Sequence, residues 1–122
     1  MDPTFKLIVD GREVAAGTLR RAVAPAAVSE LERAGRLSGN AIIKGNAVGM
    51  VTRLKVGASK ARAEFRAGEV AVNPADGSLW IFFGDAKPQS PMVPLGNVTQ
   101  GLEEVAKIRR GARVIFVVVP AS

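Results

Sequence analysis

The chain reads Arg-Val-Ile-Phe-Val-Val-Val from Arg113 to Val119, and this run of β-branched and aromatic residues predicts a strand. Because the run is apolar at consecutive positions, both faces of the strand need cover, which favours a barrel filled with side chains and a helix packed nearby. The six apolar residues are far too few to cross a bilayer, so we expect a core strand and no membrane partner.

The segment before this strand has the pattern of an amphipathic helix. Thr99 stands where it can cap the helix, Glu103 and Lys107 form an i,i+4 pair, and Gly111 ends the helix. The expected inward stripe consists of Leu102, Val105 and Ile108. We therefore expect this helix to cover one side or end of the barrel.

Turn signals divide the rest of the chain into short elements. Another helix is predicted over residues 25–34, because Pro25 suits a first helical turn and Gly35 suits a left-handed cap. The stretch 55–65 fits either a loop or a short helix. The further strands, several of them joined by two-residue turns, are predicted at Phe5–Val9, Arg12–Ala16, Ala41–Lys44, Ala47–Leu54, Glu69–Val72 and Leu79–Phe83. This count predicts a mainly β protein: a small closed antiparallel β-barrel with two helices, forming one domain over residues 1–122.

The composition excludes several classes of chemistry. The 122 residues include no cysteine, no histidine and no tyrosine. Thiol catalysis, imidazole general bases and Cys/His zinc sites are therefore excluded, and we expect no cofactor and no metal. No secretory signal is visible at the N-terminus, so we expect a cytoplasmic protein.

The net charge of +6 is unevenly distributed. Residues 1–35 and 67–122 are each neutral, whereas residues 36–66 hold the whole excess. The seven cations of this middle segment, set against Glu64 alone, are Arg36, Lys44, Arg53, Lys55, Lys60, Arg62 and Arg66. Such a segment is either a solvated face that keeps the protein soluble or a surface that attracts an anionic partner.

Three aromatic residues follow one another in a single predicted strand. Alternation along the strand places Trp80 and Phe82 on one face and Phe83 on the other. One set then fills the barrel, and the other lies under a helix or lines an outer groove. We expect at least two of the three to belong to the core.

Two segments of the second half resemble parts of a known protein family. The run Leu95-Gly-Asn-Val-Thr-Gln-Gly-Leu-Glu-Glu-Val-Ala-Lys-Ile108 is similar to the late cyclophilin segment in which a strand runs into a helix. The run Gly77-Ser-Leu-Trp-Ile-Phe-Phe-Gly84 resembles the cyclophilin strand that reads GSQFFI. The resemblance covers residues 68–119 and points to the small prokaryotic cyclophilin-like proteins of unassigned function, which implies a minimal barrel.

The chain departs from that family where catalysis would be expected. Cyclophilins that isomerise prolyl bonds carry an arginine within an FHR…QGGD pattern, and nothing like it occurs between Leu37 and Phe65. The tryptophan and histidine of their later loops have no counterpart either. We therefore expect a binding module for a peptide or a small anionic ligand, without the usual prolyl-isomerase residues, and lean against an enzyme.

The expected binding groove is edged by residues 48–66 and 80–92. Its candidate ligand-binding residues combine cations with apolar side chains and are Met50, Arg53, Lys55, Arg62, Phe83 and Met92.

Two alternative functions remain open on the sequence. A weak prolyl isomerase would use Arg53 to stabilise the twisting amide, with Met50 and Phe82 or Phe83 holding the proline ring. A nucleic-acid-binding barrel would use the basic middle segment, but Phe65 is the only aromatic within it, which makes nucleic acid the weaker expectation. The oligomeric state is left open.

Overall fold

The structure is a computed structural model that describes residues 1–58 and 60–121. Over these residues the chain forms nine strands and two helices. In chain order they are β1 (Thr4–Val9), β2 (Arg12–Leu19), α1 (Pro25–Ala34), β3 (Arg36–Asn40), β4 (Ile42–Lys44), β5 (Ala47–Met50), β6 (Glu69–Val72), β7 (Leu79–Phe82), β8 (Val93–Gln100), α2 (Leu102–Val105) and β9 (Arg113–Val119).

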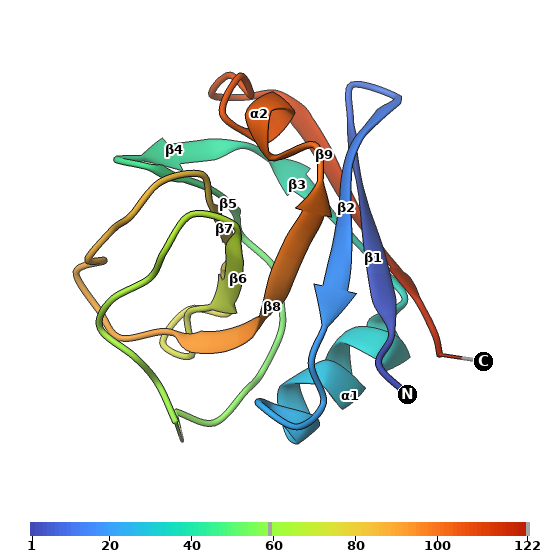
Figure 1. Cartoon of the computed structure of the whole chain (residues 1–122), viewed down its shortest axis with the longest axis vertical. Helices are drawn as coiled ribbons and strands as arrows, with labels where there is room; N and C mark the ends of the chain where they lie inside the picture. The colour runs from blue at the N-terminus through green and yellow to red at the C-terminus, as the bar shows by residue number, and fades with distance from the viewer. Residues whose placement is uncertain (59, 122) are drawn as a thin grey trace.

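The strands form one antiparallel sheet that curls into a nearly closed barrel, as the sequence predicts (Figure 1). The strand order is β3-β9-β1-β2-β8-β6-β7-β5-β4. Its two end strands, β3 and β4, are consecutive in the chain and are separated only by the buried Ala41. One bent stretch of chain therefore pairs with β9 at one end and with β5 at the other, and it brings the two edges of the sheet together.

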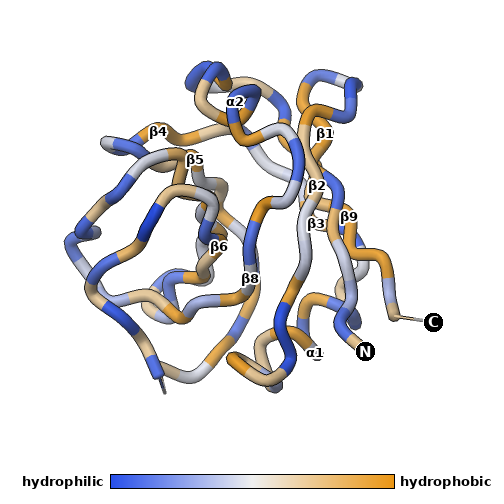
Figure 2. Tube along the Cα trace, in the orientation of Figure 1, coloured by the Kyte–Doolittle hydropathy of each residue, from blue (hydrophilic) through white to orange (hydrophobic). Residues whose placement is uncertain are grey.

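The barrel interior follows the alternation of the strands. In β9, Val114, Phe116 and Val118 point inward and are buried, and the Phe116 ring stacks on Phe5 with centroids 4.6 Å apart. The intervening Ile115 and Val117 are only half-buried. The expectation that both faces of this strand are covered is therefore met on one face, because the two helices pack toward opposite ends of the barrel (Figure 1). Figure 2 shows the hydrophobic residues concentrated along the barrel strands.

Helix α1 has the predicted boundaries. Pro25 occupies its first turn, and Gly35, with a φ of 70°, donates its backbone N–H to the carbonyl of Leu31. Ala27, Val28 and Leu31 form the buried face. Helix α1 thereby packs into the barrel core at the end where the chain begins.

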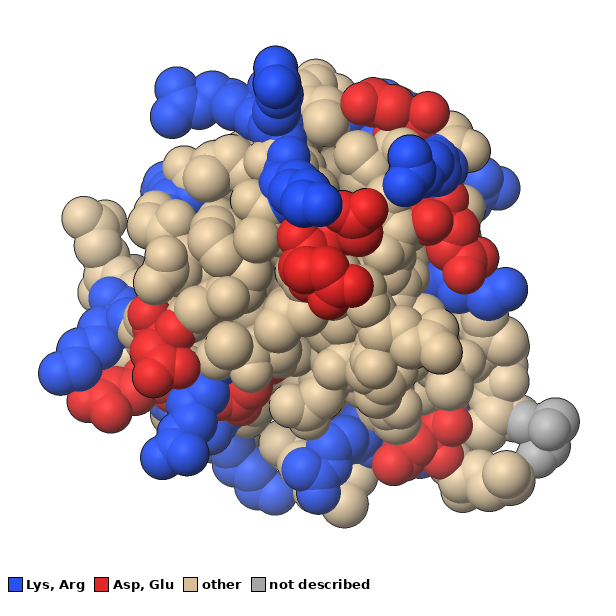
Figure 3. Space-filling model, turned by 45° about the horizontal axis from the view of Figure 1, so that its top comes forward, with Lys and Arg blue, Asp and Glu red and all other residues tan. Residues whose placement is uncertain are grey.

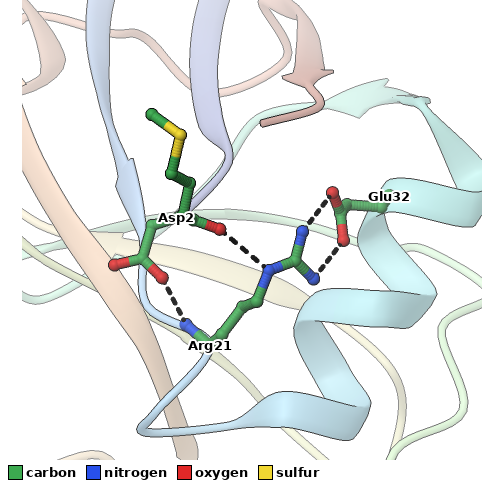
Figure 4. A network of polar contacts seen from close by, with 4 residues as sticks. Asp2, Arg21 and Glu32 are labelled. Carbon is green, nitrogen blue, oxygen red and sulfur yellow. Dashed lines mark hydrogen bonds and ion pairs between the residues drawn. The ribbon is translucent and has the colours of Figure 1, made fainter. Parts of the chain in front are cut away.

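A polar network fixes α1 to the N-terminal segment (Figure 4). The Arg21 guanidinium donates to both carboxylate oxygens of Glu32, at 2.5 and 2.7 Å, and its Nε donates to the Met1 carbonyl at 3.0 Å. The Arg21 backbone N–H donates to Asp2. The hydrogen bond to Glu32 raises the pKa of Arg21, against the opposing effect of burial.

The second helix is shorter than predicted and begins later. Thr99 does not cap it: Thr99 lies in β8, and its hydroxyl donates to the carbonyl of Ala16. The ladder between β2 and β8 extends to Gln100, so Gly101, with a φ of 84°, precedes the helix. Lys107 pairs with Glu104 at 3.2 Å and not with Glu103. The inward stripe is confirmed, with Val105 buried and Leu102 and Ile108 packed against the core.

The predicted strand 47–54 ends at Met50. Residues 51–56 belong to no strand, although Thr52 and Leu54 are buried and Arg53 is exposed; β3 pairs with β9 instead. In the described part of the ambiguous stretch 55–65 there is no helix: isolated bridges join Arg62 to Met92 and Phe65 to Ala86. The described helices include none that is long and apolar enough to span a membrane.

Candidate functional site

A second apolar cluster lies outside the barrel, on the outer face of β5, β6 and β7. The alternation predicted for the aromatic strand is confirmed: Ile81 points into the barrel, and Phe83 packs against the same inner core, whereas Trp80 and Phe82 point outward. The Phe82 ring stacks on Phe65 with centroids 4.7 Å apart. The members of the outer cluster are Ala47, Phe65, Ala71, Trp80, Phe82 and Met92.

A cleft of about 680 Å³ opens beside this outer cluster. Trp80, Phe82 and Met92 contribute its apolar floor. One wall is the β4–β5 turn, residues 44–47, and the other is the loop 85–90. Asn73 and Asp76 close one end. The cleft therefore combines segments that are far apart in the sequence but adjacent on the outside of the barrel.

Two neighbours hold the Trp80 ring in place: Gly49 packs against the ring, and Ser78 accepts a hydrogen bond from its indole N–H. Gly49 faces it on β5, and a Cβ added there would come within 2.5 Å of the ring carbon Cδ2, so only glycine allows the ring to lie this close. The indole Nε1–H donates to Ser78 Oγ at 2.7 Å. The Ser78 hydroxyl in turn donates to Asp76 Oδ1 at 2.5 Å, and the Ser78 backbone N–H donates to the same oxygen at 2.9 Å.

The side chain of Lys44 lies over the Trp80 ring, with Nζ 5.8 Å from the ring centroid. Trp80 is only 5% exposed with Lys44 in this position. Lys44 is exposed and has a long, flexible stem. The cleft therefore has a cation lying over its aromatic floor.

The charges of the cleft are balanced. Lys44 and Lys87 stand against Asp76 and Asp85. Burial raises the pKa of Asp76, but the hydrogen bonds from Ser78 and the nearby charge of Lys44 outweigh this effect, so its pKa lies below the ordinary value. The site thus offers both an ammonium and carboxylates beside an apolar floor.

Hydrogen bonds hold the two walls of the cleft together. Asn46 Nδ2 donates to the carbonyl of Asp85 at 3.0 Å, and the Phe83 backbone N–H donates to the carbonyl of Asn46. Asp85 Oδ1 accepts from the backbone N–H of Ala67, and Lys87 pairs with Glu64 at 3.4 Å. The cleft walls are therefore anchored on both sides, which favours a preformed site.

The structure brings only one of the six predicted site residues, Met92, into this cleft. Met50 is 2% exposed and lies inside the barrel, and Phe83 is half-buried against the inner core. Arg53 and Lys55 line a separate hollow between residues 52–57 and 74–77.

Arg62 lies near the outer cluster but outside the cleft. Its guanidinium carbon lies 4.7 Å from the Phe65 ring centroid, and its side chain also pairs with Glu69. Its backbone N–H donates to the carbonyl of Met92 at 2.7 Å, and the Met92 N–H donates back at 2.9 Å. Arg62 therefore supports the floor of the cleft from outside.

The six candidate residues named from the sequence do not include Lys44, Asp76 or Trp80. Lys44 belongs to the basic segment, and Trp80 lies within the expected groove edge 80–92, whereas nothing in the sequence singles out Asp76 as a site residue. Trp80 is buried as expected, but its outward face makes it a floor residue as well. The available signal was the alternation itself, because a strand with large apolar side chains on both faces needs a second covered surface.

The basic residues do not form a single stripe on the face shown in Figure 3. Lys and Arg side chains lie at separate positions there, a group of Asp and Glu side chains lies near the centre of the view, and uncharged surface lies to both sides of it. Arg62, one of the cations of the basic segment, is already paired with Glu69.

The comparisons with known proteins bear on the fold. No family model matches the chain, and a search of curated proteins finds no match. Among solved structures, the hypothetical protein AF2241 from Archaeoglobus fulgidus is similar with a TM-score of 0.76 and 20% identity, over 98% of this chain and 95% of that one. McbB, solved in complex with tryptophan, is similar with a TM-score of 0.71 and 12% identity, over 93% of this chain and 44% of McbB. The chain is thus a small β-barrel protein that shares its fold with an archaeal protein of hypothetical status and with part of McbB.

Proposed function

We propose that the chain is a cyclophilin-like binding module that takes up a peptide or a small ligand in the Trp80 cleft. The observation that carries this proposal is the apolar floor of Trp80, Phe82 and Met92 beside a cleft of about 680 Å³ on the outside of the barrel. Ligand sites are typically concave, largely apolar and lined by a few polar groups, and this cleft has that composition.

The balanced charges favour a peptide over a simple anion. Two lysines face two aspartates around the cleft, so a ligand with one negative charge gains little net attraction. Asn46, Gln89 and Ser90 line the same cleft and can donate to or accept from peptide groups. An apolar or aromatic side chain of the peptide would replace the stem of Lys44 over Trp80.

The cyclophilin-like assignment rests on two supports. The runs 77–84 and 95–108 resemble cyclophilin segments, and the fold is a nearly closed antiparallel barrel with two helices. We propose that residues 1–122 form one domain of a cytoplasmic protein. The bound tryptophan of McbB makes aromatic amino acids and aromatic peptides suitable first probes.

Trp80 is the only tryptophan in the chain and there is no tyrosine, so its fluorescence reports on the cleft alone. The experiment titrates the protein with the capped peptide Ac-Gly-Phe-Pro-Gly-NH2 and, as a control, with Ac-Gly-Ser-Pro-Gly-NH2. We expect a saturable change with the phenylalanine peptide only. Met92→Ala should raise Kd about tenfold, equivalent to about 1.4 kcal/mol, whereas Arg53→Ala should leave it unchanged.

The opposite pattern would contradict the proposal. Binding that Arg53→Ala abolishes and Met92→Ala spares would move the site to the hollow between residues 52–57 and 74–77. A protease-coupled isomerisation assay on a proline tetrapeptide tests the weak-isomerase alternative, since turnover that depends on Arg53 would favour it. Titration with RNA at two salt concentrations tests the nucleic-acid alternative, which requires a steep loss of affinity with salt.

A further inference from the structure

The bent stretch of chain that contains β3 and β4 closes the barrel. Its β4 part pairs with β5, whereas β3 pairs with a described strand, β9, on one edge only. Lys44 and Ala47 close the two-residue turn at Gly45-Asn46, so Ile42 and Lys44 direct their backbone groups toward β5. Earlier in the same stretch of chain, the Gly35 carbonyl accepts a hydrogen bond from the Val118 N–H. The Ala41 N–H donates to the Ala112 carbonyl, and the Ala41 carbonyl accepts from the Gly111 N–H. The backbone groups of the odd-numbered residues from 35 to 41 therefore face β9. Alternation then directs the backbone groups of Arg36, Ser38 and Asn40 away from β9.

The segment 51–56, which follows β5, begins beside this free edge, since a Cβ on Gly39 would lie 3.4 Å from the Val51 carbonyl oxygen. Continuing the β4–β5 register along the bent strand would place Val51 opposite Asn40 and Arg53 opposite Ser38. Gly39 does pack against Met50 at this point, since a Cβ there would lie 3.2 Å from Met50 Cβ. Beyond this contact, no backbone hydrogen bond joins β3 to the segment 51–56 within the described residues. We call the free edge of β3 together with the segment 51–56 the seam.

The seam has the surface of a strand-addition site. Val51 is 63% exposed, one of three large apolar side chains with substantial exposure among the described residues. Arg36, Ser38 and Asn40 all point outward and are exposed. An edge strand with unpaired backbone groups is a template for another strand unless it is covered, and here neither a proline nor an inward charge blocks it.

The charges at the seam are of one sign. Arg36, Arg53 and Lys55 are all exposed, and within the part of the chain that the structure describes none of them forms an ion pair. Arg113, which pairs with Asn40 across the ladder, extends its Nη2 to Ser38 at 3.4 Å and adds a fourth cation. Three of these four cations, Arg36, Arg53 and Lys55, belong to the basic segment 36–66 and lie outside the Trp80 cleft.

We propose that the seam docks an extended acidic segment of a partner protein, which adds to β3 as a further strand. The backbone groups of Arg36 and Ser38 supply the ladder, and carboxylates on the outward face of the added strand pair with Arg36, Arg53 and Lys55. An apolar residue of the added strand covers Val51. Backbone bonding gives affinity in this mode of recognition, and the charges select an acidic sequence. This site is separate from the Trp80 cleft.

The test uses the whole chain and the probe peptide Ac-Gly-Glu-Val-Glu-Val-Glu-Gly-NH2, with its lysine counterpart as the control ligand. NMR titration and amide hydrogen exchange are measured together. We expect saturable shifts at the Arg36, Ser38 and Asn40 amides, at least tenfold slower exchange there, and no binding of the lysine peptide. The double change Arg36→Glu with Arg53→Glu should weaken binding at least tenfold, whereas Arg109→Glu, an exposed arginine outside the seam, should leave it unchanged.

Other outcomes would overturn this proposal. Equal binding of the two peptides would show that the cations of the seam do not select an acidic sequence. Unchanged hydrogen exchange at the β3 amides would show that the peptide does not add to β3 as a strand. Protection of these amides that rises with protein concentration without peptide would identify a second copy as the occupant. Binding of oligothymidylate at these amides, in place of the acidic peptide, would identify a nucleic-acid surface. None of these results depends on whether the Trp80 cleft binds its own ligand.

Discussion

Replacing Gly49 with alanine should disturb the fold and the cleft together. A Cβ at this position would come within 2.5 Å of Trp80 Cδ2 and 2.6 Å of Cζ3, both on a rigid ring. Overpacking of this kind costs about 1–3 kcal/mol. If the ring moves away it also strains or loses the bond from its Nε1 to Ser78, which adds about 0.5–1.5 kcal/mol. We therefore expect Gly49→Ala to lower the free energy of unfolding by about 1.5–4.5 kcal/mol.

Urea unfolding followed by circular dichroism and by Trp80 fluorescence measures this loss. The matched control is Gly57→Ala, because Gly57 is exposed, has no neighbour within 4 Å of an added Cβ, and does not have a positive φ. The control should be neutral or stabilise by up to about 1 kcal/mol through the unfolded state. Equal stability of Gly49→Ala and the wild type, with unchanged peptide binding, would refute the close packing of Gly49 on Trp80.

Three further predictions concern the core, the N-terminal network and pH. Phe116→Ala removes a fully buried ring stacked on Phe5 and should cost about 3–5 kcal/mol in urea unfolding; a loss below about 1 kcal/mol would contradict a filled barrel. Arg21→Met should lower Tm because it breaks the two hydrogen bonds to Glu32, and the difference in Tm from the wild type should shrink at high salt. A difference in Tm that does not change with salt would contradict a contribution of the ion pair. The pKa of Asp76 is lowered in the folded state, so its ionised form stabilises the fold. This stabilisation is fully present at pH values above 3.8, the ordinary pKa of the group, and it is lost as the pH falls through the lowered pKa. The stability difference between wild type and Asp76→Asn should therefore be largest at neutral pH and vanish in acid, and a constant difference across a pH series would contradict it.

Much of the fold could be predicted because its signals are local. Helix α1 has its proline at the start and its glycine after the end, and both act within one turn of chain. The β1–β2 and β4–β5 hairpins are set by Asp10-Gly11 and Gly45-Asn46, whose glycines have positive φ angles of 83° and 54°. Such features need no knowledge of distant neighbours.

The elements that the local pattern did not predict depend on distant partners. Strand β3 has almost no apolar alternation and forms because β9 pairs along its whole length. Strand β8 contains Pro94, which is normally unfavourable inside a sheet, but Pro94 lies where the register with β6 shifts and no regular bond is needed. The predicted cap at Thr99 was wrong because β2 extends the pairing of β8 past it.

The cleft was harder to predict than the barrel. Lys44, Asp76, Trp80 and Met92 come from four separate segments, and only the curvature of the sheet brings them together. Met92 was the one residue of the cleft chosen from the sequence. Arg53 was chosen for its charge and its place after a strand, but alternation turns it outward on an unpaired segment away from the aromatic floor.

The most direct test of the account is to observe which protein atoms contact a bound aromatic peptide. Intermolecular NOEs between the phenylalanine ring of Ac-Gly-Phe-Pro-Gly-NH2 and the protein give this observation. The account predicts contacts with the Trp80 indole protons and the Met92 methyl group. Saturable binding with contacts only to Arg53 and Lys55, and none to Trp80, would contradict it.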